Sequence, residues 1–111
     1  MIELTKSEEV LRNVLIGFIT KNQLTTYKEV EDATGIPRRS QGYALGRVAE
    51  YDFQNGLPMT PSIVCSKDTG HPSWGYYVKA SEINKFSGRG YEAKMKFWVS
   101  ELHRCYQAFI K

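Results

Sequence analysis

Hydrophobic residues recur every three or four positions through the first part of the chain. Over residues 10–19 they form a wide apolar stripe, which predicts a first helix that reaches about residue 21 and packs into the core. Thr5 with Glu8, or Ser7 alone, predicts the cap at the start of this helix.

The next periodic segment, residues 26–55, predicts two helices joined by a tight turn. Thr26 and Glu29 have capping-box spacing at the start of the first helix, and Gly35 supplies the left-handed residue that ends it. Pro37 suits the first turn of the second helix, which opens with two arginines. A helix, a glycine-containing turn and a longer helix are typical of a helix-turn-helix unit.

After this unit the pattern changes from helical to extended. Residues 57–61 hold two prolines and predict an extended connector. Residues 62–66 and 74–79 are rich in β-branched and aromatic residues and predict two strands, with a polar turn at residues 67–70 between them. A β-hairpin directly after a recognition-type helix predicts a winged helix in which residues 62–79 form the wing.

Helical spacing returns in the C-terminal third. Residues 82–86 predict a short helical turn that Gly88 and Gly90 close, and residues 91–110 predict a long amphipathic helix. We expect the apolar face of this last helix to pack on the core or to form a dimer contact. The protein is therefore expected to be a monomer or a homodimer through the C-terminal helix.

Together these elements predict a single α+β domain over residues 1–111. The expected fold is a mostly helical winged helix-turn-helix with one β-hairpin and an extra C-terminal helix. Residues 1–61 would form the helical core, with the helix-turn-helix at residues 26–55. The hairpin wing would follow at residues 62–79 and the C-terminal helices at residues 81–111.

Composition and charge narrow the class of partner. The chain is 41% hydrophobic and 24% charged, which excludes a disordered or collagen-like protein. The formal net charge of +3 is unevenly distributed: residues 1–37 sum to −2, residues 38–78 to +1 and residues 79–111 to +4. This distribution predicts a positive surface on the second helix of the helix-turn-helix and on the C-terminal third. Ordinary solvated faces remain the alternative.

The soft metal ligands are few and badly spaced. Cys65 and Cys105 are far apart in apolar settings and predict reduced core thiols rather than a disulfide. His103 and Cys105 are two residues apart on a predicted helix and so point in different directions. Cys65 and His71 lack a conventional zinc spacing. We therefore expect no metal and no cofactor.

The sequence also lacks the pattern of an enzyme. Asp68, His71 and Ser73 cluster in the expected hairpin tip, but such residues are common in turns and no rigid elbow holds the serine. No glycine-rich phosphate loop or pair of catalytic carboxylates stands out. The longest apolar run, residues 14–19, is too short to span a bilayer and no leader opens the chain, so a cytoplasmic protein without membrane contact is expected.

Short motifs between residues 8 and 79 resemble a known DNA-binding domain. Thr26-Tyr27, then residues 37–45 (Pro-Arg-Arg-Ser-Gln-Gly-Tyr-Ala-Leu), then Leu57-Pro58 and Pro61 are similar to the pattern of O6-alkylguanine-DNA alkyltransferases and alkyltransferase-like proteins. That pattern is a threonine–tyrosine helix start, Arg-x-x-Gly-x-Ala-aliphatic in the recognition helix, and a proline-rich approach to a hairpin.

The resemblance implies roles for individual residues. Arg39 stands at the place of an arginine finger that enters the minor groove and fills the space of a flipped base. Tyr27 matches a tyrosine that presses on the adjacent phosphate, and Gly42 and Ala44 match small residues that let the helix backbone approach the duplex. From the residues alone, Arg39 could equally be a cation at an exposed helix start and Tyr27 a core residue.

The reactive part of that family is missing. Its Pro-Cys-His-Arg motif has no counterpart, because Ser62, Ile63 and Val64 follow Pro61 and Cys65 comes too late. Alkyl transfer through an activated thiolate is therefore not supported. The segment after residue 90 lies outside the match altogether, so only the binding scaffold carries over.

The combined interpretation is a non-catalytic protein that binds nucleic acid, with duplex DNA as the expected partner. The alternative is a small protein-binding inhibitor or adaptor on the same scaffold, for example a phage-type anti-defence protein. An enzyme related to the alkyltransferases is a third reading, opposed by the lost cysteine motif. The candidate nucleic-acid-binding residues are Tyr27, Arg38, Arg39, Ser40, Gly42, Tyr43, Arg47, Lys67 and Trp74.

Overall fold

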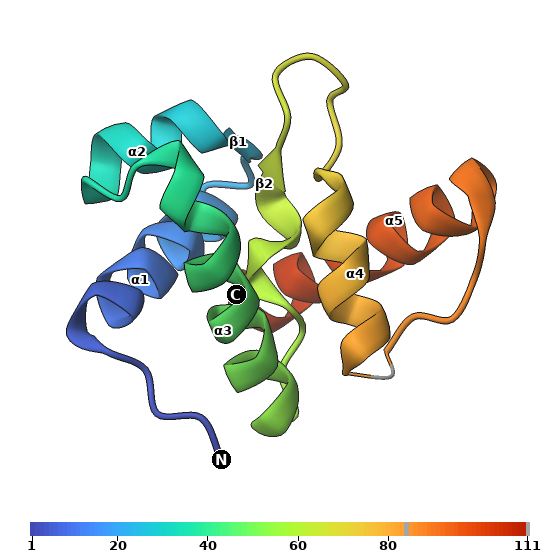
Figure 1. Ribbon diagram of the computed structural model, residues 1–111, viewed down its shortest axis with the longest axis horizontal. Helices are drawn as coiled ribbons and strands as arrows, with labels where there is room; N and C mark the ends of the chain where they lie inside the picture. The colour runs from blue at the N-terminus through green and yellow to red at the C-terminus, as the bar shows by residue number, and fades with distance from the viewer. Residues whose placement is uncertain (84, 111) are drawn as a thin grey trace.

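In the computed structural model, which describes residues 1–83 and 85–110, five α-helices surround a short central segment of 3-10 helix and strand (Figure 1). The protein is mostly helical with a very small sheet, which agrees with the α+β class. The elements in chain order are α1 (Lys6–Thr20), β1 (Thr25–Thr26), α2 (Tyr27–Thr34), α3 (Arg38–Gln54), η1 (Thr60–Ile63, a 3-10 helix), β2 (Val64–Cys65), α4 (Trp74–Glu82) and α5 (Gly90–Phe109).

The helical core forms where the sequence places it. Thr5 with Glu8 and Thr26 with Glu29 make complete capping boxes at the starts of α1 and α2, so the first free amides of both helices are satisfied. Gly35 has a φ of 77° and ends α2 in the left-handed conformation. Helix α3 begins directly after the turn that contains Pro37, so the predicted pair of helices is confirmed.

The predicted β-hairpin at residues 62–79 is wrong. The strand that was expected over residues 74–79 is helix α4. Strand β2 instead pairs in parallel with β1, with Thr25 opposite Val64 and Thr26 opposite Cys65. The cause is tertiary packing: Tyr76, Tyr77 and Ala80 are buried together at helical spacing, which overrides the strand preference of aromatic residues.

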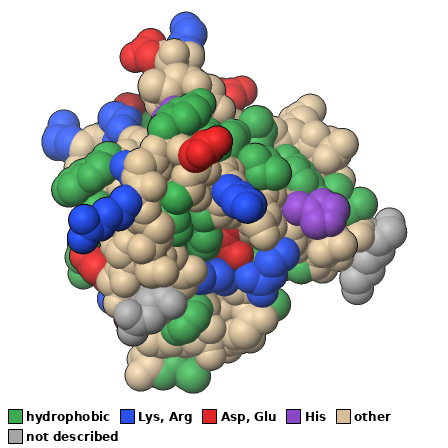
Figure 2. Space-filling view, turned by 90° about the vertical axis from the view of Figure 1, so that its right-hand side faces the viewer, with side chains coloured by type: hydrophobic (Ala, Val, Ile, Leu, Met, Phe, Trp, Pro, Cys, Tyr) green, Lys and Arg blue, Asp and Glu red, His purple; other side chains and the backbone are tan. Residues whose placement is uncertain are grey.

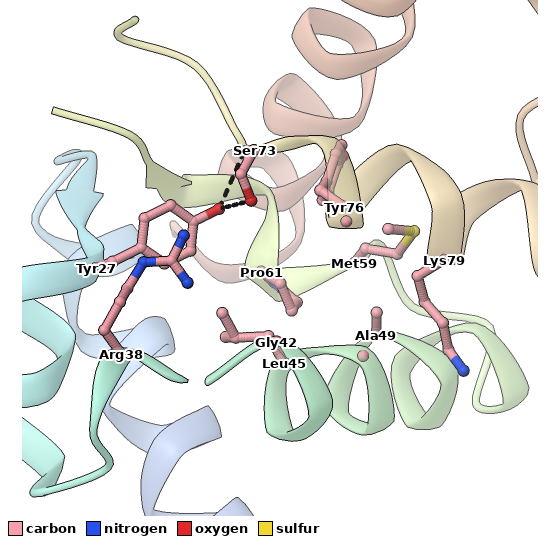
Figure 3. Close-up of a pocket in the computed structure, with 12 residues that line it drawn as sticks. Tyr27, Arg38, Gly42, Leu45, Ala49, Met59, Pro61, Ser73, Tyr76 and Lys79 are labelled. Atoms are coloured by element: carbon pink, nitrogen blue, oxygen red, sulfur yellow. Dashed lines mark hydrogen bonds between the residues drawn. The ribbon is translucent and has the colours of Figure 1, made fainter. Parts of the chain in front are cut away.

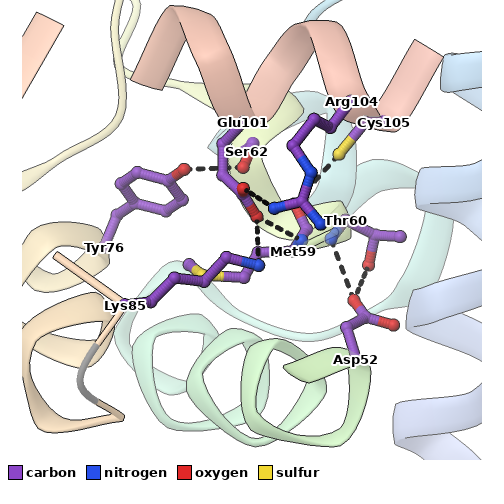
Figure 4. Close-up of polar contacts among 9 residues, drawn as sticks. All are labelled: Asp52, Met59, Thr60, Ser62, Tyr76, Lys85, Glu101, Arg104 and Cys105. Atoms are coloured by element: carbon purple, nitrogen blue, oxygen red, sulfur yellow. Dashed lines mark hydrogen bonds and ion pairs between the residues drawn. The ribbon is translucent and has the colours of Figure 1, made fainter. Parts of the chain in front are cut away.

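The connector after α3 also differs from its prediction. Its second half is not extended but turns into η1, whose residues are all buried. Polar side chains from distant helices satisfy its backbone (Figure 4). Asp52 accepts hydrogen bonds from the amide and the hydroxyl of Thr60, at 2.9 and 2.7 Å. Glu101 accepts from the amide of Met59 at 2.8 Å, so α3 and α5 hold this segment from two sides.

Glu101 is itself almost fully buried and is balanced by two cations. Lys85 lies 2.9 Å and Arg104 2.8 Å from its carboxylate oxygens. The amphipathic helix predicted at the C-terminus is confirmed as α5, which packs on η1 and α1. The short helical turn predicted over residues 82–86 includes residue 84, which lies outside the described residues.

The hydrophobic interior has two parts. One cluster joins α1, α2, α3, η1, β2 and α5 around Leu11, Leu15 and Val48. The other joins α3, α4 and α5 around Met59, Tyr76 and Tyr77. Both thiols are buried and unbridged, as predicted. Among residues 1–83 and 85–110 no helix has the length and apolar character that crossing a membrane requires.

Candidate nucleic-acid interface

A narrow cleft runs between α3 and α4 (Figure 3). Tyr27 and Arg38 stand at one end and Lys79 at the other, and the floor is apolar, with Leu45, Met59 and Pro61. Its volume of about 50 Å³ leaves room for a few water molecules and no larger guest. We call this feature the α3–α4 cleft.

Tyr27 ties the start of α2 to the start of α4. Its ring is buried, and its hydroxyl oxygen lies 2.8 Å from the hydroxyl of Ser73. The amide of Ser73 also donates to the Tyr27 oxygen at 3.0 Å. Ser73 is the N-cap residue of α4, but its side chain serves Tyr27 instead of capping the helix. The contact therefore fixes the relative position of the two helix starts.

The first turn of α3 presents two arginines to solvent. The guanidinium of Arg38 lies over the Tyr27 ring, 3.9 Å from its centre. Arg39 is exposed beside it, and the first turn of α3 contains no acidic residue. Within the described part of the chain neither arginine forms an ion pair. Two uncompensated cations thus stand at the positive end of a helix dipole.

The surface next to these arginines has little side-chain cover. Ser40 and Gly42 are exposed on α3, and a Cβ atom added at Gly42 would meet nothing within 4 Å. The same is true of Gly75 in the first turn of α4. Both glycines line the α3–α4 cleft, so a partner can reach the helix backbone on either side of it.

Two large aromatic side chains remain in solvent on the two helices that border the cleft. Tyr43 on α3 is 75% exposed, and Trp74, the first residue of α4, is 73% exposed. Aromatic rings of this size are normally buried, so their exposure on both helices of the cleft is informative. Each offers a ring face on which a base or another side chain could stack.

Lys67 joins the candidate surface through the loop of residues 66–73. It lines an open hollow of about 390 Å³ together with Tyr27 and Arg38. The loop is ordered by its own hydrogen bonds, since the Ser66 amide donates to the carbonyl of His71 and the Gly70 amide donates to that of Ser66, both at 2.9 Å. Lys67 is therefore presented on a defined turn rather than on the expected hairpin.

Arg47 does not belong with the other candidates. Its Nε donates to Glu8 at 2.7 Å and its terminal nitrogen to the carbonyl of Glu3 at 2.8 Å. These bonds connect α3 to α1 and to the segment before it, and the positive charge of Arg47 is balanced by Glu8. Of the nine candidate residues, Tyr27, Arg38 and Gly42 line the α3–α4 cleft, and Lys67 lines the open hollow with Tyr27 and Arg38. The other exposed candidates, Arg39, Ser40, Tyr43 and Trp74, follow these residues on α3 or begin α4, and Arg47 is bonded elsewhere.

Several cleft residues escaped the sequence analysis. Ser73, Gly75 and Lys79 line the cleft from α4, a helix that was read as a strand. Two signals in the sequence could have identified this helix. Ser73 is a typical N-cap residue, and Tyr76, Tyr77 and Ala80 recur at the spacing of one helix face.

The groups considered for catalysis or metal binding do not converge. Burial raises the pKa of Cys65 to about 11 and that of Cys105 to about 12, so both thiols stay protonated at neutral pH. The Ser73 hydroxyl bonds Tyr27, and Nδ1 of His71 lies 3.0 Å from the carbonyl of Pro72. In residues 1–83 and 85–110 no three His, Cys, Asp or Glu side chains gather where a metal ion could bind.

Comparisons with known proteins leave the site without a precedent. No protein-family model, no curated protein and no solved structure matches this chain. The case for its function therefore depends on the geometry described above.

Proposed function

We propose that this protein binds duplex DNA without catalysis, through α3, the first residues of α2 and α4, and the loop of residues 66–73. The loop takes the place of the wing that the sequence predicted. Contacts would come from the candidate residues other than Arg47, whose guanidinium is paired with Glu8.

The observation that carries this proposal is the uncompensated charge at the start of α3. Cations near a helix N-terminus oppose the helix dipole and cost stability unless an anion is close. Arg38 and Arg39 lack such a partner among the described side chains. A phosphate group would supply it, since arginine binds phosphate through two parallel hydrogen bonds.

The bare backbone at Gly42 supports the same conclusion. Glycine within a helix costs about 1 kcal/mol relative to alanine. No neighbour in the fold requires the missing Cβ, because the space beside it is empty. Close approach of an external partner to the helix backbone would explain why glycine stands at this position. A helix that lies in a DNA groove makes such an approach.

Separate observations support the part of the proposal that the protein is not a catalyst. Both thiols are buried and protonated, and the resemblance to the alkyltransferase family stops at its reactive motif. Cys65 lies in β2, where its thiol faces the carbonyl of Ile63. A duplex held at α3 would therefore meet no cysteine among the residues that line the cleft.

The salt dependence of binding tests the proposal. Anisotropy of a labelled duplex, measured from low to physiological salt, should show weak binding that fades as salt rises. Each neutralised phosphate steepens the log–log slope by about 0.9, so three or four contacts predict a slope of about −3. Absence of binding at low salt would refute the proposal.

The exposure of Tyr43 and Trp74 favours a second candidate function. Tyrosine, tryptophan and arginine are the residues enriched at protein–protein interfaces, and this surface holds all three. A protein-binding inhibitor or adaptor would use the same face. It would bind its partner with little loss of affinity between low and physiological salt, in contrast to DNA.

A further inference from the structure

We propose that the DNA-binding surface continues beyond α3, across the 66–73 loop, to the start of α5. There Arg89, Tyr91 and Lys94 would contact the backbone of the same duplex. This inference rests on the proposed function. It adds a second contact region on a helix that lies outside the part of the chain resembling a known DNA-binding domain.

A continuous set of contacts connects the two regions. On one side of the loop, Ser73 is bonded to Tyr27, which carries Arg38 on its ring. On the other side, the His71 ring packs edge-on against Tyr91, with ring centres 6.0 Å apart, and lies 6.4 Å from Trp98. The loop is thus held between α2 and α5, and in Figure 1 it rises between α2 and the first turn of α5.

The start of α5 combines an exposed arginine and a half-buried lysine with an exposed ring. Tyr91 is 69% exposed although it touches His71. Arg89 is the N-cap residue of α5 and is exposed, and Lys94 lies over the Tyr77 ring, 5.5 Å from its centre. Glu92 is the acidic residue of this turn. The local balance still favours positive charge.

Arg89 and Lys94 differ from other cations of the C-terminal third in their ion pairing. Lys79, Lys85 and Arg104 are each paired with a glutamate. Within residues 1–83 and 85–110, Arg89 and Lys94 have no such partner. Figure 2, which looks onto the side of the molecule that carries α5, shows Lys and Arg spread more widely than Asp and Glu. This charge complements a polyanion.

The size of the molecule sets the length of DNA involved. The described residues extend 33 × 33 × 31 Å. One turn of B-DNA, about ten base pairs, is about 34 Å long. A surface from α3 to the start of α5 can therefore cover up to about one turn, and α3 with the cleft covers only part of that surface. The second region should matter on long duplexes and not on short ones.

The test uses two double variants with equal loss of charge. Arg89→Gln with Lys94→Gln removes the charge of the proposed contacts and keeps an unbranched polar side chain at both positions. Lys6→Gln with Lys96→Gln removes two exposed lysines that form no ion pair in the described part of the chain. Lys96 is five residues beyond Tyr91, about 140° around α5, and Lys6 begins α1. Thermal melting first establishes that both proteins fold.

Anisotropy is then measured with duplexes of about 8 and about 16 base pairs at low salt. On the longer duplex we expect the Arg89/Lys94 variant to lose about tenfold in affinity and about 2 in salt slope. On the shorter duplex it should match the unchanged protein, and the Lys6/Lys96 variant should change less than twofold on either.

Three results would overturn the inference. Equal losses in the two double variants would mean diffuse charge attraction. A loss on the short duplex as large as on the long one would mean that α5 belongs to the α3 contact. Wild-type binding that does not strengthen with duplex length would mean no second region. In all three the protein still binds DNA, whereas no binding to either duplex would refute the proposed function itself.

Discussion

The guanidinium carbon of Arg38 lies 3.9 Å from the centre of the Tyr27 ring, and the hydroxyl of that ring is bonded to Ser73. The first residues of α2 and α3 and the N-cap of α4 therefore meet at one point. The stacked Arg38 is held in place before any partner arrives, whereas its neighbour Arg39 extends into solvent. The two arginines should accordingly differ in role, with Arg38 shaping the surface and Arg39 reaching the partner.

Arg39→Ala should weaken binding to duplex DNA by about 1–3 kcal/mol if α3 enters a groove, because a desolvated contact is lost. Lys6→Ala is the matched control, since Lys6 is an exposed cation without an ion pair in the described residues and begins α1. Its loss should cost a few tenths of a kcal/mol at most, because physiological salt screens charge within about 8 Å. Anisotropy titrations compare the two, and equal losses would refute docking of α3.

Local signals in the sequence were enough to predict α1, α2, α3 and α5. Caps such as Thr26 with Glu29 and the stop at Gly35 are decided by residues a few positions apart. The error at α4 had a different origin. Its aromatic residues suit a strand in isolation, and only contacts with α3 and α5 make the helix favourable. The local signals for a helix, Ser73 at the N-cap and the spacing of Tyr76 and Ala80, were weaker than the strand preference of the aromatic residues.

The candidate site was predictable to a similar degree. Exposed cations at the start of α3 followed from the helix-turn-helix pattern, and the interest of Gly42 followed from the resemblance to the alkyltransferase family. Pairing between residues that are distant in sequence could not be predicted from local patterns. Arg47, for example, bonds Glu8, which is 39 positions away. The same limit applies to Ser73, whose partner Tyr27 is 46 positions away.

The pairing of Glu8 should make stability depend on pH in the acid range. Burial alone raises the pKa of Glu8, but the hydrogen bond from the Thr5 amide and the ion pair with Arg47 outweigh it and hold that pKa below its ordinary value. A lowered pKa in the folded state stabilises the fold above the unfolded pKa of about 4.3, and this stabilisation disappears as pH falls further.

Glu8→Gln should therefore lower the free energy of unfolding at pH 7 by about 1 kcal/mol, with the difference from the unchanged protein vanishing near pH 3. Glu9→Gln is the control, because Glu9 is exposed, carries the same charge and pairs with no cation among the described residues. Urea titrations from pH 7 to pH 3 measure both. A Glu9 variant with the same profile would contradict the role of the Arg47 pair.

Neither thiol should react while the protein is folded. The pKa of about 11 for Cys65 and about 12 for Cys105 leaves almost no thiolate at pH 8, and both side chains are buried. Labelling with a disulfide reagent should be slow in buffer and rapid in denaturant, where the pKa returns to about 8.5. Intact-mass analysis after incubation with an O6-alkylguanine duplex should show no adduct, and a stoichiometric adduct would mean that the protein is an alkyltransferase.

Gly42→Ala should separate stability from binding more sharply than any charge change. The new methyl group would meet nothing in the fold, and alanine is the better helix former, so the free energy of unfolding should rise by about 0.5–1 kcal/mol. The same methyl group would stand between the α3 backbone and the proposed duplex, so affinity should fall by about fivefold or more, equivalent to about 1 kcal/mol.

Gly17→Ala in α1 is the matched control, because a Cβ there also meets nothing within 4 Å and the residue is far in sequence from the candidate surface. It should raise stability by a similar amount and leave DNA affinity unchanged. Thermal melting and anisotropy on the same samples give both quantities. If Gly42→Ala stabilised the protein and bound DNA as well as Gly17→Ala does, no partner would approach the α3 backbone, and the surface that carries the proposed function would lie elsewhere.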